Sequence, residues 1–202
     1  QVAPADRDRA AVPEDGLLVD ASPAERSRVS QARVAHGKAR DDLAASKRQH
    51  ELALFEQATA KQQHGAAVDE VSWAKSTLDK SKTTGTKTDI ETAQVALQTA
   101  ENARGIQDVR CELRNREVIE AEMQTALATA HVNLATAQVD LAKVVAVNTL
   151  DRPLTQKPDV ERFEAMVREA EGLENVARAG LTAASREVEI GRSRLSDREQ
   201  TR

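Results

Sequence analysis

The fold is decided by residues 29–81, which read VSQARVAHGKARDDLAASKRQHELALFEQATAKQQHGAAVDEVSWAKSTLDKS. Every seventh residue of this stretch is small: Ala32, Ala39, Ser46, Ala53, Ala60, Ala67, Ala74 and Ser81. A second series lies three residues before the first: Val29, His36, Leu43, His50, Gln57, His64, Val71 and Leu78. Together they form one stripe along a helix, which is the heptad pattern of a coiled coil.

Two further stretches carry the same spacing. One stripe contains Ile106, Val109, Leu113, Arg116, Glu120, Met123, Leu127, Ala130, Leu134, Ala137, Leu141 and Val144. The other contains Val160, Phe163, Val167, Ala170, Glu174, Ala177, Leu181, Ala184, Val188, Gly191 and Leu195. The sequence therefore predicts an all-α protein of three long helices in an elongated antiparallel coiled-coil bundle. The small residues favour a close approach of the helix backbones.

Helix-start and helix-stop signals divide the chain. Residues 1–21 hold scattered charge, Pro and Gly, and we expect a flexible lead or tether there. Ser22 and Pro23 begin the bundle, which extends over 22–200. Gly85 and the Pro-containing segment 149–158 interrupt it, and the expected helices cover about 22–83, 88–148 and 158–197.

The matched lengths of the first two helices, each roughly 90 Å at 1.5 Å per residue, predict a hairpin around Gly85. Leu43 is then expected opposite Leu127, Gln57 opposite Leu113, and His50 opposite Glu120. The third helix is expected to return along the second until Leu195 reaches the level of Cys111. Residues from about 60 to 110 are left as a two-helix tip with few buried contacts.

Composition excludes several classes of protein. The aromatic residues are Phe55, Trp73 and Phe163 alone, which are too few for an ordinary compact core. The net charge is −4 with both signs interspersed, so we expect no nucleic-acid partner. No apolar run approaches the roughly 18 residues of a membrane span, and we expect no transmembrane segment.

The sequence offers no recognisable catalytic chemistry. The eight glycines form no phosphate-binding loop, and no nucleophile stands in a familiar setting with His and Asp. We expect no enzyme activity, no catalytic residues and no bound cofactor. A helical zinc site needs His residues four apart, whereas His36, His50 and His64 recur every fourteen residues, so we expect no metal.

The three histidines allow two interpretations. They can be polar layers that set the register of the bundle, with Glu120 as the partner of His50. They can also form a pH-sensitive seam, and that hypothesis predicts a loss of helix stability between about pH 7 and pH 5.

Near the turn, Trp73, Leu78 and Ile90 are candidates for contact with a protein partner, because Trp is favoured at interaction hot spots. Trp73 can equally cap the tip.

Cys111, the one cysteine, allows two interpretations: a small filler beside the stripe or a reactive thiol.

The residues after the turn, Thr88-Asp89-Ile90-Glu91 and the Ala-rich helix that follows, resemble the α-helical hairpin of periplasmic adaptor (membrane-fusion) proteins. Residues 128–135, ATAHVNLA, are similar to the end of the returning helix in that family. The β-rich flanking domains and the Arg-x-x-x-Leu pattern of the tip are missing, and a third helix is added. The resemblance implies an envelope role and transfers no functional residues.

These features predict a non-enzymatic structural or protein-interaction coiled coil, a spacer or docking component of a bacterial cell envelope. We expect it in the periplasm or at the outer membrane, with a membrane tether upstream of Gln1. Two alternatives stay open: a transport adaptor that docks its tip onto a channel, and an oligomeric effector or filament component, secreted or cytoplasmic.

Overall fold

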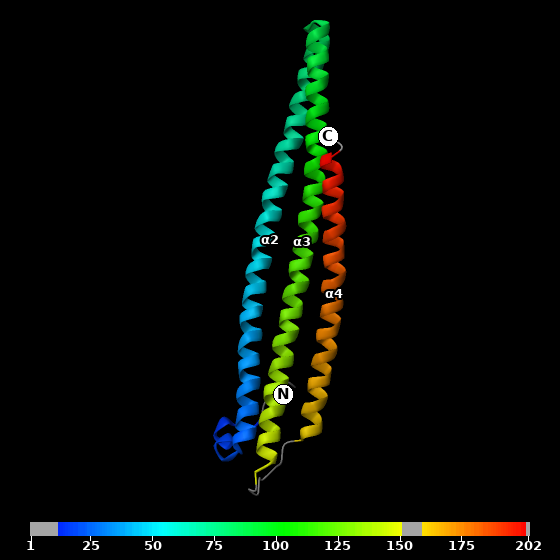
Figure 1. Ribbon diagram of the computed structural model, residues 1–202. Helices are drawn as coiled ribbons and strands as arrows, with labels where there is room; N and C mark the ends of the chain where they lie inside the picture. Colours follow the sequence, from blue (N-terminus) through cyan, green and yellow to red (C-terminus); the bar gives the residue numbers. More distant parts are fainter. Residues whose placement is uncertain (1–11, 151–158, 201–202) are drawn as a thin grey trace, which may run out of the picture. The chain divides into compact units, whose positions relative to one another are not determined.

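The protein is all-α, with three long helices that pack against each other (Figure 1). The computed structural model describes residues 12–150 and 159–200, and within these ranges no strand occurs. A 3-10 helix, η1 (Asp15–Asp20), precedes α2 (Pro23–Thr84), α3 (Lys87–Asn148) and α4 (Val160–Gln200). The observed bounds of the long helices lie within three residues of the expected ones. Residues 1–11 of the expected lead and 151–158 of the expected connection lie outside the described ranges.

Local signals set the helix ends. Ser22 caps α2, because its Oγ accepts a hydrogen bond from the Glu25 N–H at 3.2 Å. At the start of α3, Asp89 Oδ2 accepts from the Thr86 N–H at 2.8 Å and from the Thr86 hydroxyl at 2.7 Å. The Asp89 N–H in turn faces Thr86 Oγ1 at 3.4 Å, which makes a reciprocal capping box. Thr86 therefore starts the helix, earlier than the expected Thr88 or Asp89.

Gly85 forms the turn for a steric reason. Its N–H donates to the Ser81 carbonyl at 2.8 Å. A Cβ at this position would lie only 2.7 Å from that same carbonyl oxygen. The described glycines have no positive φ, so Gly85 is not the left-handed cap that the sequence suggests. The lack of a side chain is what the turn requires.

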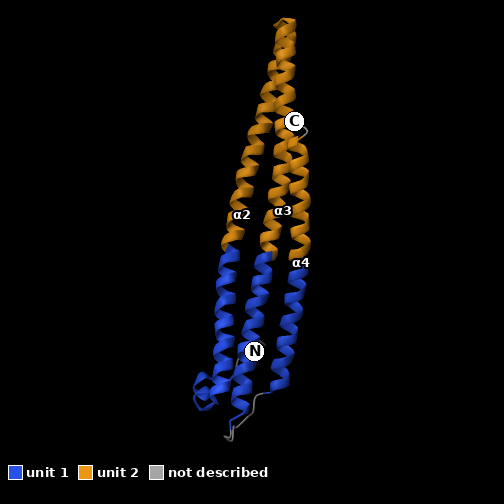
Figure 2. Cartoon of the chain, viewed as in Figure 1, with its two compact units in different colours: residues 1–47, 124–180 blue, residues 48–123, 181–202 orange. Residues whose placement is uncertain are grey.

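The chain divides into two compact units (Figure 2). Unit 1 comprises residues 1–47 and 124–180, and unit 2 comprises residues 48–123 and 181–202. Each long helix contributes one segment to each unit.

In unit 1, η1 anchors the segment before α2. Leu18 and Ala21 are buried in one apolar cluster, whose other buried members are Val29, Ala146, Val147 and Leu150. Asp15 lies 2.9 Å from Lys143 Nζ and 2.6 Å from the Arg33 guanidinium. These ion pairs hold the pKa of Asp15 below its usual range, with the hydrogen bond from Lys143 as the largest cause. The expectation of a flexible lead is therefore wrong for residues 15–21, because Leu18 and Ala21 bury apolar surface there.

The predicted stripes of the first and third helices agree with the burial. The buried side chains of α2 all belong to its stripe: Val29, Ala60, Ala67, Val71, Ala74 and Leu78. Those of α4 do so too: Phe163, Ala170, Ala184 and Val188. Each of these helices buries one narrow face, and half of its buried side chains are alanine.

The middle helix differs, because α3 buries two stripes. The expected stripe faces α4 in unit 2, where a Cβ added at Gly191 would lie 3.0 Å from Leu113 Cδ1. A second stripe faces α2: Ala100 packs with Val71 and Ala74 in unit 2, and Ala146 packs with Val29 in unit 1. Its other buried members follow at heptad spacing: Val118, Ala121, Ala128 and Ala135. At about 100° per residue the two stripes lie roughly 150° apart on the helix.

This second stripe corrects the expected pairing of α2 with α3. Leu113 lies against α4, so it is not opposite Gln57. Gln57 instead donates from Nε2 to Asn115 Oδ1 at 2.9 Å. The register differs from the expected one by two residues.

Within unit 2, α4 reaches the level of Gly105, where Arg198 lies against that glycine. Leu195 shares a groove with Arg110 and Leu113, close to the expected level of Cys111. The part of unit 2 nearest Gly85 consists of α2 and α3 alone (Figure 2).

Candidate functional site

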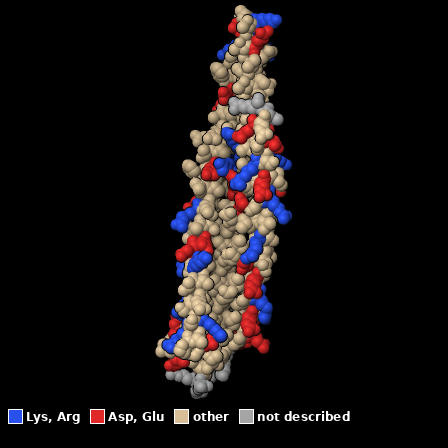
Figure 3. Space-filling model, viewed as in Figure 1, with Lys and Arg blue, Asp and Glu red and all other residues tan. Residues whose placement is uncertain are grey.

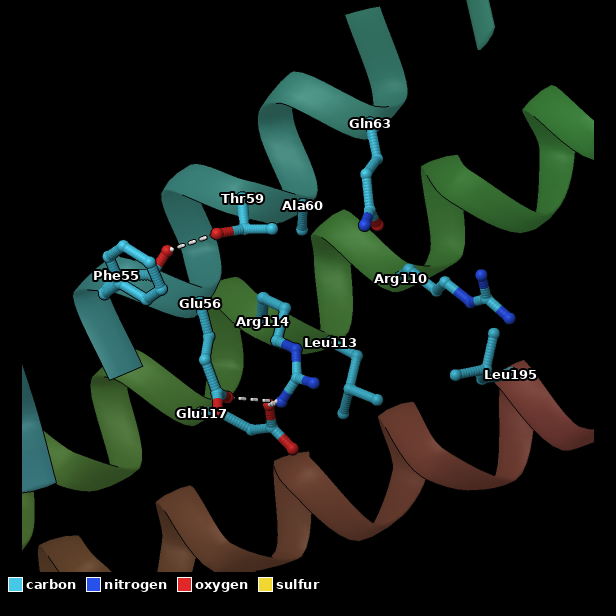
Figure 4. A pocket seen from close by; sticks show the side chains of 10 residues that line it. All are labelled: Phe55, Glu56, Thr59, Ala60, Gln63, Arg110, Leu113, Arg114, Glu117 and Leu195. Atoms are coloured by element: carbon cyan, nitrogen blue, oxygen red, sulfur yellow. Dashed lines mark hydrogen bonds and ion pairs between the residues drawn. The ribbon is translucent and has the colours of Figure 1, made fainter. Parts of the chain in front are cut away.

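Unit 2 contains a groove of about 420 Å³ to which all three long helices contribute (Figure 4). From α2 it receives Phe55, Glu56, Thr59, Ala60 and Gln63; from α3, Arg110, Leu113, Arg114 and Glu117; and from α4, Leu195. The groove exists because α2 and α4 occupy two separate faces of α3 and leave a third face of that helix between them. Phe55 lies at its edge and is 70% exposed.

Charged side chains in the groove pair with one another. Arg114 lies 2.8 Å from Glu56 Oε2 and also pairs with Glu117. Arg110 donates to Glu199 of α4 at 2.7 Å. The pairs with Glu56 and Glu199 link α3 to its neighbours, whereas Glu117 lies on the same helix as Arg114. Surface pairs of this kind contribute about 0–1 kcal/mol each. The buried Ala60 and Leu113 form an apolar floor in the groove, and the compensated charges lie around it.

The charge distribution offers no concentrated field to a charged ligand. Figure 3 shows Lys and Arg interspersed with Asp and Glu over the face that it draws. Counterion-driven binding of nucleic acid needs a basic stripe, and this face does not display one.

Two histidines on the α2 stripe each meet a carboxylate of α3. His64 Nε2 lies 2.6 Å from Asp108 Oδ1. His50 Nε2 lies 3.8 Å from Glu122 Oε1, two residues beyond the expected Glu120. Glu120 instead accepts a hydrogen bond from Ser185 Oγ of α4 at 2.6 Å, so the expected pairing of His50 with Glu120 is wrong.

In unit 1, His36 lies close enough to Asp140 for its charge to act on that carboxyl. Burial is the largest influence on Asp140 and raises its pKa, while Lys143 and His36 oppose the rise. The fourth histidine, His131, lies 3.2 Å from Glu174 Oε1 of α4. Three of the four histidines of the chain, His50, His64 and His131, thus lie within 4 Å of a carboxylate on a neighbouring helix.

Of the three candidate partner-binding residues near the turn, one is well exposed. Trp73 is 69% exposed, whereas Leu78 is only 7% exposed and belongs to the buried stripe of α2. Ile90 is partly buried. A substitution at Leu78 would therefore remove packing between α2 and α3.

Cys111 is half-buried and free. Burial raises the pKa of its thiol, and the negative charge of Asp108 adds to the rise. The thiolate is the reactive form of cysteine, so this environment favours the unreactive thiol. Among the described residues no group of three or more His, Cys, Asp and Glu side chains is placed to hold a metal ion. No described helix has the length and apolar character needed to cross a bilayer.

Sequence reasoning did not find the groove. Phe55 stands out in the sequence only as a rare aromatic. Arg110, Arg114 and Glu117 resemble the other charged residues of the chain. The available signal was the second stripe of small residues on α3, because a helix with two buried stripes must have neighbours on two sides.

Comparison with protein-family models, with curated proteins and with solved structures gives no match to this chain.

Proposed function

We propose that this chain is a non-enzymatic structural and protein-interaction module, built as an antiparallel three-helix coiled coil in which α3 is the central helix. The observation that carries the proposal is the burial pattern. The buried side chains of α2 and α4 lie on single heptad stripes, and α3 has two. A layer of helices held by narrow Ala-rich stripes leaves long polar faces outward and suits a spacer or docking element.

Antiparallel pairing is supported by contacts in unit 2. Gln57 pairs with Asn115, His64 with Asp108, and Lys75 with Glu101. The residue numbers rise along α2 while those of the partners on α3 fall, as antiparallel helices require. On this arrangement the segments nearest Gly85 form a two-helix tip.

Disulfide trapping tests this pairing. In a Cys111→Ser background, Val71→Cys with Ala100→Cys is expected to crosslink within one chain, because the two side chains share a buried cluster. The matched control pairs Val71→Cys with Val95→Cys, since Val95 is 67% exposed. Equal crosslinking of both pairs, or crosslinking only between chains, would contradict the antiparallel hairpin.

We place the module in the bacterial cell envelope, at the periplasm or outer membrane, on the strength of the resemblance of residues 88–97 and 128–135 to adaptor hairpins. Fractionation of cells that express the full-length gene checks this assignment. Recovery with the periplasm or the outer membrane supports it, and recovery with cytoplasmic proteins overturns it.

A second function, end-on docking of the tip to a protein partner such as a channel, is favoured by the exposure of Trp73. A large aromatic that does not pack in its own chain is a common anchor at interfaces. Trp73→Ala is expected to abolish binding to that partner and to leave the circular dichroism of the chain unchanged. Val34→Ala, at an equally exposed apolar position in unit 1, is the control. Retained binding of the Trp73→Ala variant would exclude docking through this residue.

A further inference from the structure

We propose that two histidines of the α2 stripe form a proton-operated clasp, in which protonation of His50 and His64 tightens the pairing of α2 with α3. The clasp concerns the isolated chain and needs no partner, so its failure would leave the proposed function standing.

The pair of His64 and Asp108 is the best formed. Their 2.6 Å contact joins side chains that are 34% and 46% exposed. Asp108 also lies 3.9 Å from the Arg104 Nε of its own helix. The cation one turn before His64 on α2, Lys61, donates to Gln57 Oε1 at 3.1 Å. Asp108 is thus the negative group that faces the imidazole, and an imidazolium there adds charge to an existing contact.

The contact between His50 and Glu122 is longer than a hydrogen bond. Nε2 of His50 is buried without a hydrogen-bond partner, and Glu122 Oε1 stands 3.8 Å away. Glu120, the other carboxylate nearby on α3, accepts from Ser185 of α4. A charged imidazole at His50 would draw Glu122 into a direct hydrogen bond and satisfy the buried nitrogen.

His36, the third histidine of the stripe, lies in unit 1 near Asp140 and Lys143, and Lys143 is also an ion-pair partner of Asp15 from η1. Arg33, one turn before His36, pairs with the same Asp15. Because Lys143 already supplies a positive charge near Asp140, the clasp is confined to His50 and His64.

The direction of the pH effect on stability follows from the carboxylates that face the histidines. A histidine that faces a carboxylate across a helix pair favours the paired state when it is protonated. Its contribution is present at low pH and is lost as the pH rises through the range where histidine titrates, about pH 5–8. This is opposite to the loss of stability that a pH-sensitive seam of unpartnered histidines would show.

The test compares thermal unfolding of the wild-type chain and the His50→Gln/His64→Gln variant at about pH 8 and about pH 6. The wild-type Tm is expected to rise on acidification by about 3–6 °C relative to the variant, the scale of one to two modest interactions in a chain of this size. An equal change in both proteins, or a smaller rise in the wild type, overturns the proposal.

A double-mutant cycle separates the clasp from a purely structural role and does not rely on that variant. His64→Gln, Asp108→Asn and their combination are measured at both pH values. The coupling between the two side chains is expected to be at least three times larger at the lower pH. Coupling that is independent of pH identifies a structural hydrogen bond and contradicts the clasp at this pair.

Discussion

Gly191 lies where α4 packs closely on α3. A Cβ there would lie 3.0 Å from Leu113 Cδ1 and 3.4 Å from Arg116 Cδ. We predict that Gly191→Leu lowers the free energy of unfolding by about 1–3 kcal/mol, because the added atoms have no space against the buried Leu113. Urea unfolding followed by circular dichroism measures the change. A stability equal to that of the wild type would mean that α4 shifts freely on α3.

Gly65 and Gly172 provide the matched control, since neither has another atom within 4 Å of its would-be Cβ. Both lie inside long helices, where Gly is about 1 kcal/mol less favourable than Ala. Gly65→Ala and Gly172→Ala are therefore expected to raise stability by up to about that amount each. A loss in either variant would point to a neighbour outside this chain at that position.

Asp140 is a carboxyl at which burial opposes ionisation, and its pKa is raised. A raised pKa means that the folded chain binds the proton more tightly, so the charged form costs stability at neutral pH and the cost disappears as the pH falls. We predict that Asp140→Asn increases the Tm at about pH 7. The increase is expected to shrink as the pH falls toward the ordinary pKa of Asp, about 4, and to vanish below it. An increase that is the same at both pH values would assign the effect to hydrogen bonding.

Among the elements, α3 shows most clearly what the sequence could predict and what it could not. The stripe of Leu113 and Leu127 was found because Leu, Ile and Met contrast with polar neighbours. The stripe that faces α2 was missed because Ala121, Ala128 and Ala135 occur among many other alanines. Small side chains bury little area each and give a weak periodic signal, although their spacing is regular.

The same limit affected the candidate sites. The spacing of the three stripe histidines places them on one face of α2, and in the structure all three are partly buried. Their partners could not be assigned, because a two-residue change of register replaces Glu120 by Glu122. The sequence does not predict η1 for another reason: its apolar run, residues 17–19, is too short to show a periodicity, and only the contacts of Leu18 in unit 1 reveal the anchor.

Close packing of α2 on α3 gives a prediction for the element pair. Ala100 is 5% exposed and packs with Val71 and Ala74. Ala100→Leu is expected to cost about 1–3 kcal/mol, because the helices must separate to admit the larger side chain. Ala96→Leu is the control, since Ala96 is exposed on the same helix. Equal stability of the two variants would show that the helices near the turn do not depend on close contact.

At the scale of the whole molecule, the proposed coiled coil predicts an elongated monomer. A helix of 62 residues such as α2 is roughly 90 Å long at 1.5 Å per residue. A compact globule of this size would have a radius of gyration of only about 17 Å. Small-angle scattering is therefore expected to give a radius of gyration clearly above that value.

Sedimentation must accompany the scattering, because a parallel oligomer would also be long. A monomeric mass together with a long maximum dimension requires each chain to fold back on itself, as a turn at Gly85 demands. The Val71→Cys/Ala100→Cys variant links the two measurements, since oxidation should leave the mass and the scattering curve unchanged if the pair already touches within one chain. A dimeric or trimeric mass with the same length would replace the hairpin by an assembly of extended chains, and the clasp histidines would then meet their carboxylates between copies.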